Sequence, residues 1–152
     1  MKRFNLISIA FYLSLFVILS GCGSSSSDVD AHKRICPECH MPLKDSNIHT
    51  STIKKDAETV YFDDIGCMIL YTHKNDIDLK KVDAEVFTND THKYLDAYKA
   101  NYTINEKTPM HYGFGAYGLD KKGTILFDEV VLKMLRGENM ANPKIRKQIL
   151  GY

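Results

Sequence analysis

The chain has 152 residues, and its 20 lysines and arginines nearly balance its 19 aspartates and glutamates, for a formal net charge of +1. A balanced chain without a basic patch or a charge block argues against nucleic acid as a partner. Its length is that of one domain with room for a leader.

The N-terminal segment has the order of a secretory signal. Two basic residues precede an apolar run from Phe4 to Leu19, and small residues then lead to Cys22. The run is shorter than the roughly 20 residues that cross a bilayer, so a signal peptide over 1–21 is favoured over a retained transmembrane anchor. The segment resembles the lipobox of bacterial lipoproteins, which implies acylation of Cys22 and a lipid-anchored protein facing the periplasm. Gly23, in place of aspartate, favours the outer membrane over the inner one.

The rest of the chain divides into a tether and a domain. Residues 22–33 are Ser-rich and have no periodicity, which predicts a flexible, lipid-anchored tether before a metal-binding domain over 34–152. Pro37 and Pro42 bracket a constrained loop. Strands are expected at 49–54 and 58–62, and Asp63 or Asp64 is expected to cap a helix that runs to about Lys74.

Further along the chain, strands are expected at 84–88 and 101–104, with an extended segment over 110–117. Asp128 is expected to cap a second helix, which Gly137 ends. Asn142 and Pro143 begin a short last helix. Strand pairs that are each followed by a helix predict an α+β fold.

The strongest chemical signal is the hexapeptide Cys36-Pro37-Glu38-Cys39-His40-Met41. Two thiols three positions apart can converge on one ion, and the Met41 thioether makes the set soft, which favours Cu(I) over Zn(II). A structural disulfide and half of a zinc site remain alternatives, although a zinc ribbon requires a second Cys-x-x-Cys. His40 would be a ligand only if its neighbours leave the coordination incomplete.

A second signal follows Pro109, which fixes the backbone before Met110 and His111. These side chains offer one soft and one borderline ligand, although a lone methionine in a strand usually belongs to the core. Cys67 is expected in the first turn of its helix. There the helix dipole would lower its pKa, unless Cys67 is simply a small core residue.

Taken in order, these motifs resemble the NosL family, the copper-binding accessory lipoproteins of nitrous-oxide reductase. The resemblance extends from about Cys36 to Leu135, and Cys67 and the extension after Gly137 are not part of it. It implies two ββαβ-type units that form one small domain. It also implies one Cu(I), held by Cys39, Met41 and Met110 with Cys36 as a fourth ligand. The family usually has glycine at the position of His40.

The implied function is that of a copper carrier, or metallochaperone, which is not an enzyme. It would pass Cu(I) to a periplasmic cuproenzyme such as nitrous-oxide reductase or to the complex that matures it. The alternative is a thioredoxin-like thiol–disulfide oxidoreductase that uses Cys36 and Cys39. Such an enzyme needs a strand leading into Cys36 and a helix leaving Cys39, whereas this chain has a tether before and Pro42 after.

Overall fold

The computed structural model describes residues 34–152. The expected signal peptide (1–21), the tether (22–33) and the lipidation site Cys22 lie outside the described residues.

The larger of two sheets contains four antiparallel strands in the order β2-β1-β3-β4. The bounds of these strands are β1 (Ser51–Lys55), β2 (Glu58–Phe62), β3 (Asp83–Phe87) and β4 (Tyr94–Asp96). Ser51 pairs with both Phe62 and Val86, so the start of β1 and the ends of β2 and β3 lie at one end of the sheet. The chain leaves β2 at this end and enters a helix at once.

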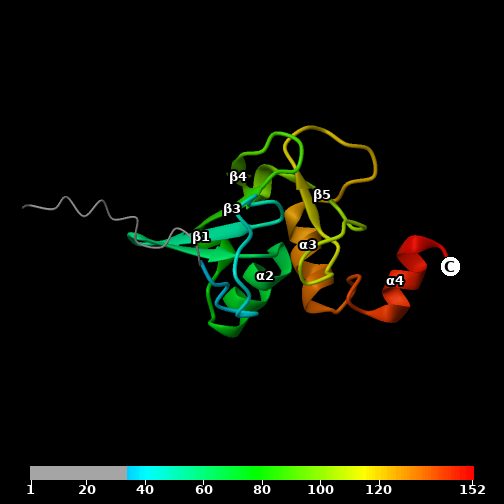
Figure 1. The fold of residues 1–152 in the computed structure, drawn as a ribbon, viewed down its shortest axis with the longest axis horizontal. Coiled ribbons are helices and arrows are strands. Elements are labelled where there is room, and N and C mark those ends of the chain that lie inside the picture. The colour runs from blue at the N-terminus through cyan, green and yellow to red at the C-terminus, as the bar shows by residue number, and fades with distance from the viewer. Residues whose placement is uncertain (1–33) are drawn as a thin grey trace, which may run out of the picture. The chain divides into compact units, whose positions relative to one another are not determined.

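That helix, α2 (Ile65–Lys74), begins where the sequence predicts. Asp64 is the N-cap, and its side chain accepts a hydrogen bond from the Gly66 N–H. Such a bond satisfies one of the backbone donors that a helix start leaves free. The helix packs beside β1 and β2 (Figure 1), and most of its apolar side chains are buried. Of the two candidate caps, Asp64 is therefore correct, and Asp63 has another role.

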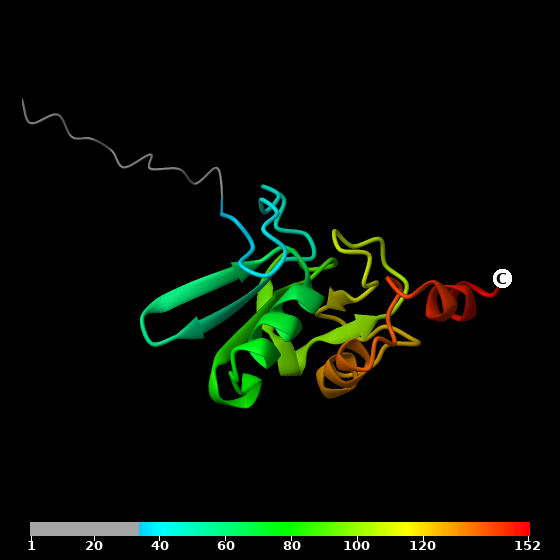
Figure 2. The same ribbon diagram turned by 90° about the horizontal axis from the view of Figure 1, so that it is seen from below.

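The second half of the domain is built on a two-stranded sheet of β5 (Asn101–Thr103) and β6 (Gly115–Tyr117). Short 3-10 helices, η2 (Leu79–Lys81) and η3 (Ala97–Lys99), connect the elements before it. After β6, α3 (Phe127–Leu135) packs beside α2. The last helix, α4 (Pro143–Leu150), buries no residue and stands apart from the sheets in both views (Figures 1 and 2).

The α+β class is confirmed. In the first half, β1, β2, α2 and β3 follow the expected ββαβ order. In the second half, β5 and β6 lead to α3, which α4 follows in place of a strand.

Two local expectations are wrong. Leu126, not Asp128, is the N-cap of α3, and Asp128 lies in the first turn, where a carboxylate still favours the helix dipole. The segment 110–117 is a strand only from Gly115, because Thr108 and His111 close a turn before it.

Candidate metal centre

The predicted cysteine loop is closed by its own backbone. Ile35 and Pro42 form an antiparallel bridge, and the Leu43 N–H donates to the Arg34 carbonyl at 2.8 Å. Inside this bridge, the His40 N–H donates to the Cys36 carbonyl at 2.9 Å. Pro37 occupies the turn position that its fixed φ suits. The loop therefore holds its cysteines in place without help from a disulfide.

His40 adopts a positive φ of 60° at the end of this turn. Non-glycine residues enter this left-handed region at a cost of about 1–2 kcal/mol. A glycine would adopt this conformation without that cost. His40 is exposed and belongs to the turn rather than to the cluster described next.

Three cysteines and one aspartate converge where the loop meets the start of α2. Cys36 and Cys39 come from the loop, Cys67 from the first turn of α2, and Asp63 from the residue before the cap. Their ligand atoms all lie within 4.8 Å of one another. The three cysteines are free thiols. Cys36 and Cys67 are fully buried and Cys39 is partly exposed, so the cluster can be reached from the side of Cys39.

Asp63 is the least expected member of the cluster. Its side chain is only 3% exposed, although a buried carboxylate is costly unless its oxygens have partners. The Cys39 thiol donates to Asp63 Oδ1 at 3.1 Å, whereas Oδ2 is buried without a hydrogen-bond partner. An oxygen left in this state beside three thiols fits a role as a metal ligand.

The charges of the three thiols depend on one another. A hydrogen bond from the Cys67 thiol lowers the pKa of Cys36 to about 6, against the opposing effect of burial. Burial raises the pKa of Cys39 to about 12, and the hydrogen bond to Asp63 adds to this rise. Hydrogen bonding to Cys36 and burial raise the pKa of Cys67 as well. The metal-free cluster thus favours one thiolate, and a cation is needed to stabilise the others.

Of the two alternatives for Cys67, the small core residue is correct, because Cys67 is fully buried in the core, and the lowered pKa is wrong. Cys67 does lie in the first turn of α2, but hydrogen bonding to Cys36 and burial raise the pKa of its thiol. Neither alternative for Cys67 included membership of a cluster.

The second predicted motif reaches the same end of α2. Pro109 lies in a turn closed by the His111 N–H, which donates to the Thr108 carbonyl at 3.0 Å. The Met110 N–H donates to Asp64 Oδ2 at 3.1 Å, while Asp64 Oδ1 caps the helix. One carboxylate therefore ties the Met110 turn to the start of α2.

Tyr112 strengthens this attachment. Its ring lies so close to Gly66 that a Cβ built there would be 2.2 Å from Tyr112 Cδ2. Burial raises the pKa of Tyr112 to about 12, and the nearby Cys67 and Asp64 contribute to the rise. The absence of a side chain at Gly66 is therefore what lets the 108–112 segment pack beside the cluster.

The expected ligands are distributed unevenly. Cys36 and Cys39 are in the cluster, and Met110 is half-buried against the core at the same helix end. Met41 is 37% exposed on the loop. His111 is exposed, with Nδ1 3.1 Å from the Thr108 carbonyl, and lies outside the group of converging donors. Sequence reasoning did not identify Asp63 and Cys67 as members of the cluster, because they reach the cysteine loop only through the tertiary fold.

The donor set defines what the cluster can do. Three thiols and one carboxylate within 4.8 Å could hold a metal ion. Thiolates suit soft and borderline ions such as Cu(I) and Zn(II), and disfavour hard cations. Around Cys36 and Cys39 the described chain has neither the preceding strand nor the following helix of a thioredoxin-like site.

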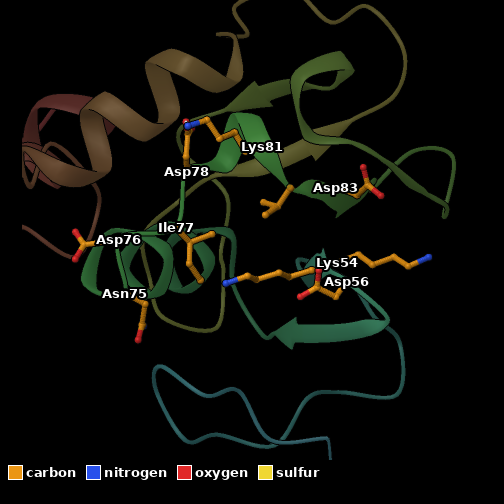
Figure 3. A pocket seen from close by; sticks show the side chains of 10 residues that line it. Lys54, Asp56, Asn75, Asp76, Ile77, Asp78, Lys81 and Asp83 are labelled. Carbon is orange, nitrogen blue, oxygen red and sulfur yellow. The ribbon is translucent and has the colours of Figure 1, made fainter.

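A surface hollow lies at the opposite end of β1 and α2. Lysines and acidic residues line it together, among them Lys54, Asp56, Asp76 and Lys81 (Figure 3). Neither a cysteine nor a histidine is among its lining residues. This hollow therefore has no part in the metal centre.

The fold and the cluster define a small α+β domain with a group of three cysteines and an aspartate that could hold a metal ion. Comparisons of the chain with protein-family models, with characterised proteins and with solved structures found no match. The resemblance to the NosL family accordingly rests on the sequence motifs and stays a prediction. Within residues 34–152, no helix is long and apolar enough to span a membrane.

Proposed function

We propose that the chain is a lipid-anchored carrier that binds one Cu(I) as cargo and passes it to a periplasmic cuproenzyme or its maturation complex. The observation that carries this proposal is the convergence of Cys36, Cys39 and Cys67 within 4.8 Å. Cu(I) is a soft ion and is satisfied by a small number of thiolate ligands. A NosL-type recipient such as nitrous-oxide reductase is the partner that the sequence resemblance implies.

The exposure of the ligands suits a carrier. Cys36 and Cys67 are shielded, whereas Cys39 is partly exposed and its neighbour Met41 is more exposed. A ligand from the recipient can approach the ion only from the side of Cys39. Transfer then proceeds by ligand exchange, in which an incoming sulfur or imidazole replaces Cys39 before the buried thiolates release the ion. Met110 is held at the same helix end by its bond to Asp64 and is the proposed thioether ligand.

Copper binding is tested with the full chain, reduced and metal-free, in competition with a chromophoric Cu(I) chelator. The parent is expected to bind about one Cu(I), and Cys39→Ser and Cys67→Ser should each weaken binding by about tenfold or more. Cys22→Ser is the matched control in protein produced without acylation, because it then removes a free thiol outside the described domain. Parent-like affinity in both Cys39→Ser and Cys67→Ser would refute thiolate binding at the cluster.

The anchor is tested separately, because it rests on the leader sequence alone. Two or three acyl chains hold a protein at a bilayer far more firmly than one. Cys22→Ser should therefore release or mislocalise the protein when cells are fractionated. A cleaved Cys22→Ser protein that stays with the membranes would contradict the lipoprotein assignment.

A further inference from the structure

Asp63 raises a question that Cu(I) binding leaves open. Three thiolates already satisfy Cu(I), which has little affinity for a carboxylate oxygen. Yet Asp63 is only 3% exposed, its Oδ1 accepts from Cys39, and its Oδ2 is buried without a partner. A buried acceptor without a partner costs about 1–3 kcal/mol, so its presence needs a reason.

Helix capping is not that reason. The adjacent Asp64 caps α2 through Oδ1 and binds the Met110 N–H through Oδ2, so both of its oxygens are used. Asp63 makes neither contact. Its carboxylate lies instead among the thiols of Cys36, Cys39 and Cys67, all within 4.8 Å.

A set of three sulfurs and one oxygen has the number and type of donors that a tetrahedral borderline ion takes. Zn(II) sites are four-coordinate, and thiolate and carboxylate are both among the ligands of this ion. We propose that the Cys36–Cys39–Asp63–Cys67 cluster is also a four-donor site for Zn(II), in which Asp63 is the ligand that separates Zn(II) from Cu(I). This inference uses the same cluster as the proposed function but does not require copper delivery.

The experiment measures Zn(II) and Cu(I) affinities of the reduced full chain by chelator competition, with Co(II) as a spectroscopic substitute for Zn(II). The parent should bind Zn(II), and its Co(II) form should show thiolate charge-transfer bands and tetrahedral ligand-field bands. Asp63→Asn keeps the size and the acceptor for Cys39 but loses the anionic oxygen. It should weaken Zn(II) binding by about tenfold or more and change Cu(I) binding by less than about threefold.

Asp56→Asn is the charge-matched control. Asp56 is exposed in the β1–β2 turn, and asparagine tolerates its positive φ of 57°. This variant should bind both ions like the parent. A loss of Zn(II) affinity smaller than about tenfold in Asp63→Asn would overturn the proposal. An equal loss for both ions would also overturn it, because Asp63 would then act on the fold rather than on selectivity.

Failure of the two proposals can be told apart. If the parent binds Zn(II) through Asp63 but does not bind Cu(I), the copper-carrier proposal is refuted. If it binds Cu(I) but not Zn(II), the Zn(II) site is refuted. If Asp63→Asn does not fold, Zn X-ray absorption of the parent decides the matter. We expect three sulfur ligands and one oxygen, and a shell with fewer sulfurs or without oxygen would overturn the proposal.

Discussion

The contact between Gly66 and Tyr112 predicts a substitution whose effect on stability changes sign with its background. In Gly66→Ala, the new Cβ would lie 2.2 Å from Tyr112 Cδ2, whereas ordinary contacts begin at 3.4 Å. The ring must therefore retreat by roughly 1 Å, and such overpacking costs about 1–3 kcal/mol. Alanine in place of glycine in a helix returns about 0.5–1 kcal/mol. We expect a net loss of about 0.5–2 kcal/mol in the free energy of unfolding.

In a Tyr112→Ala background the obstacle is gone, so the same Gly66→Ala change should stabilise by about 0.5–1 kcal/mol. The assay is urea denaturation of the reduced, metal-free protein in a four-member double-mutant cycle. Because Tyr112 belongs to the segment that carries Met110, Gly66→Ala should also weaken Cu(I) binding. An equal loss of stability in both backgrounds would show that the ring does not rest on Gly66.

Three further substitutions test other contacts. Met110→Leu keeps the apolar volume and should weaken Cu(I) binding by about tenfold, whereas Met134→Leu in α3 should not; equal affinities would leave Met110 out of the site. His40→Gly should raise the free energy of unfolding by about 1 kcal/mol in denaturant titrations without changing Cu(I) affinity, and a loss of stability would contradict the strained turn. Burial lowers the pKa of His49 below its ordinary 6.5, so folding becomes less favourable as the pH falls through 6.5. His49→Asn, which tolerates the φ of 71°, should reduce this acid destabilisation in a comparison of unfolding at pH 7 and pH 5; an unchanged dependence would exclude His49 as its source.

Local patterns accounted for the elements that local forces determine. Asp64 begins α2 because a capping side chain precedes an apolar face, and Asn142 with Pro143 begins α4 for similar reasons. The predicted start of α3 was two residues too late, because an aspartate is favourable both at the N-cap and in the first turn of a helix. The short β4 was not expected, since its three residues are too few to give a clear local pattern and depend on tertiary contacts such as pairing with β3.

The sequence predicted the members of the site that lie close together along the chain, but not those that only the fold brings together. Cys36 and Cys39 share one loop, so their spacing alone indicated a metal site. Cys67 and Asp63 join them only because β2 and α2 bring the helix start to that loop, and a single sequence carries no direct sign of that meeting. The burial of Cys67 was the favoured alternative, but its raised pKa also depends on Cys36, which comes from the distant loop.

The cysteine loop precedes the strands and helices of the described domain, so an ion bound there would join this loop to α2. In the loop from Arg34 to Leu43 only Cys36 is fully buried, and the other residues are half-buried or exposed. An ion bound by both Cys36 and Cys67 would therefore stabilise the packing of this segment on α2. A pulling force applied from the N-terminal side would act on the metal-bound contact between the loop and α2 before it acted on the four-stranded sheet. We therefore expect metal binding to slow backbone hydrogen exchange across residues 34–43.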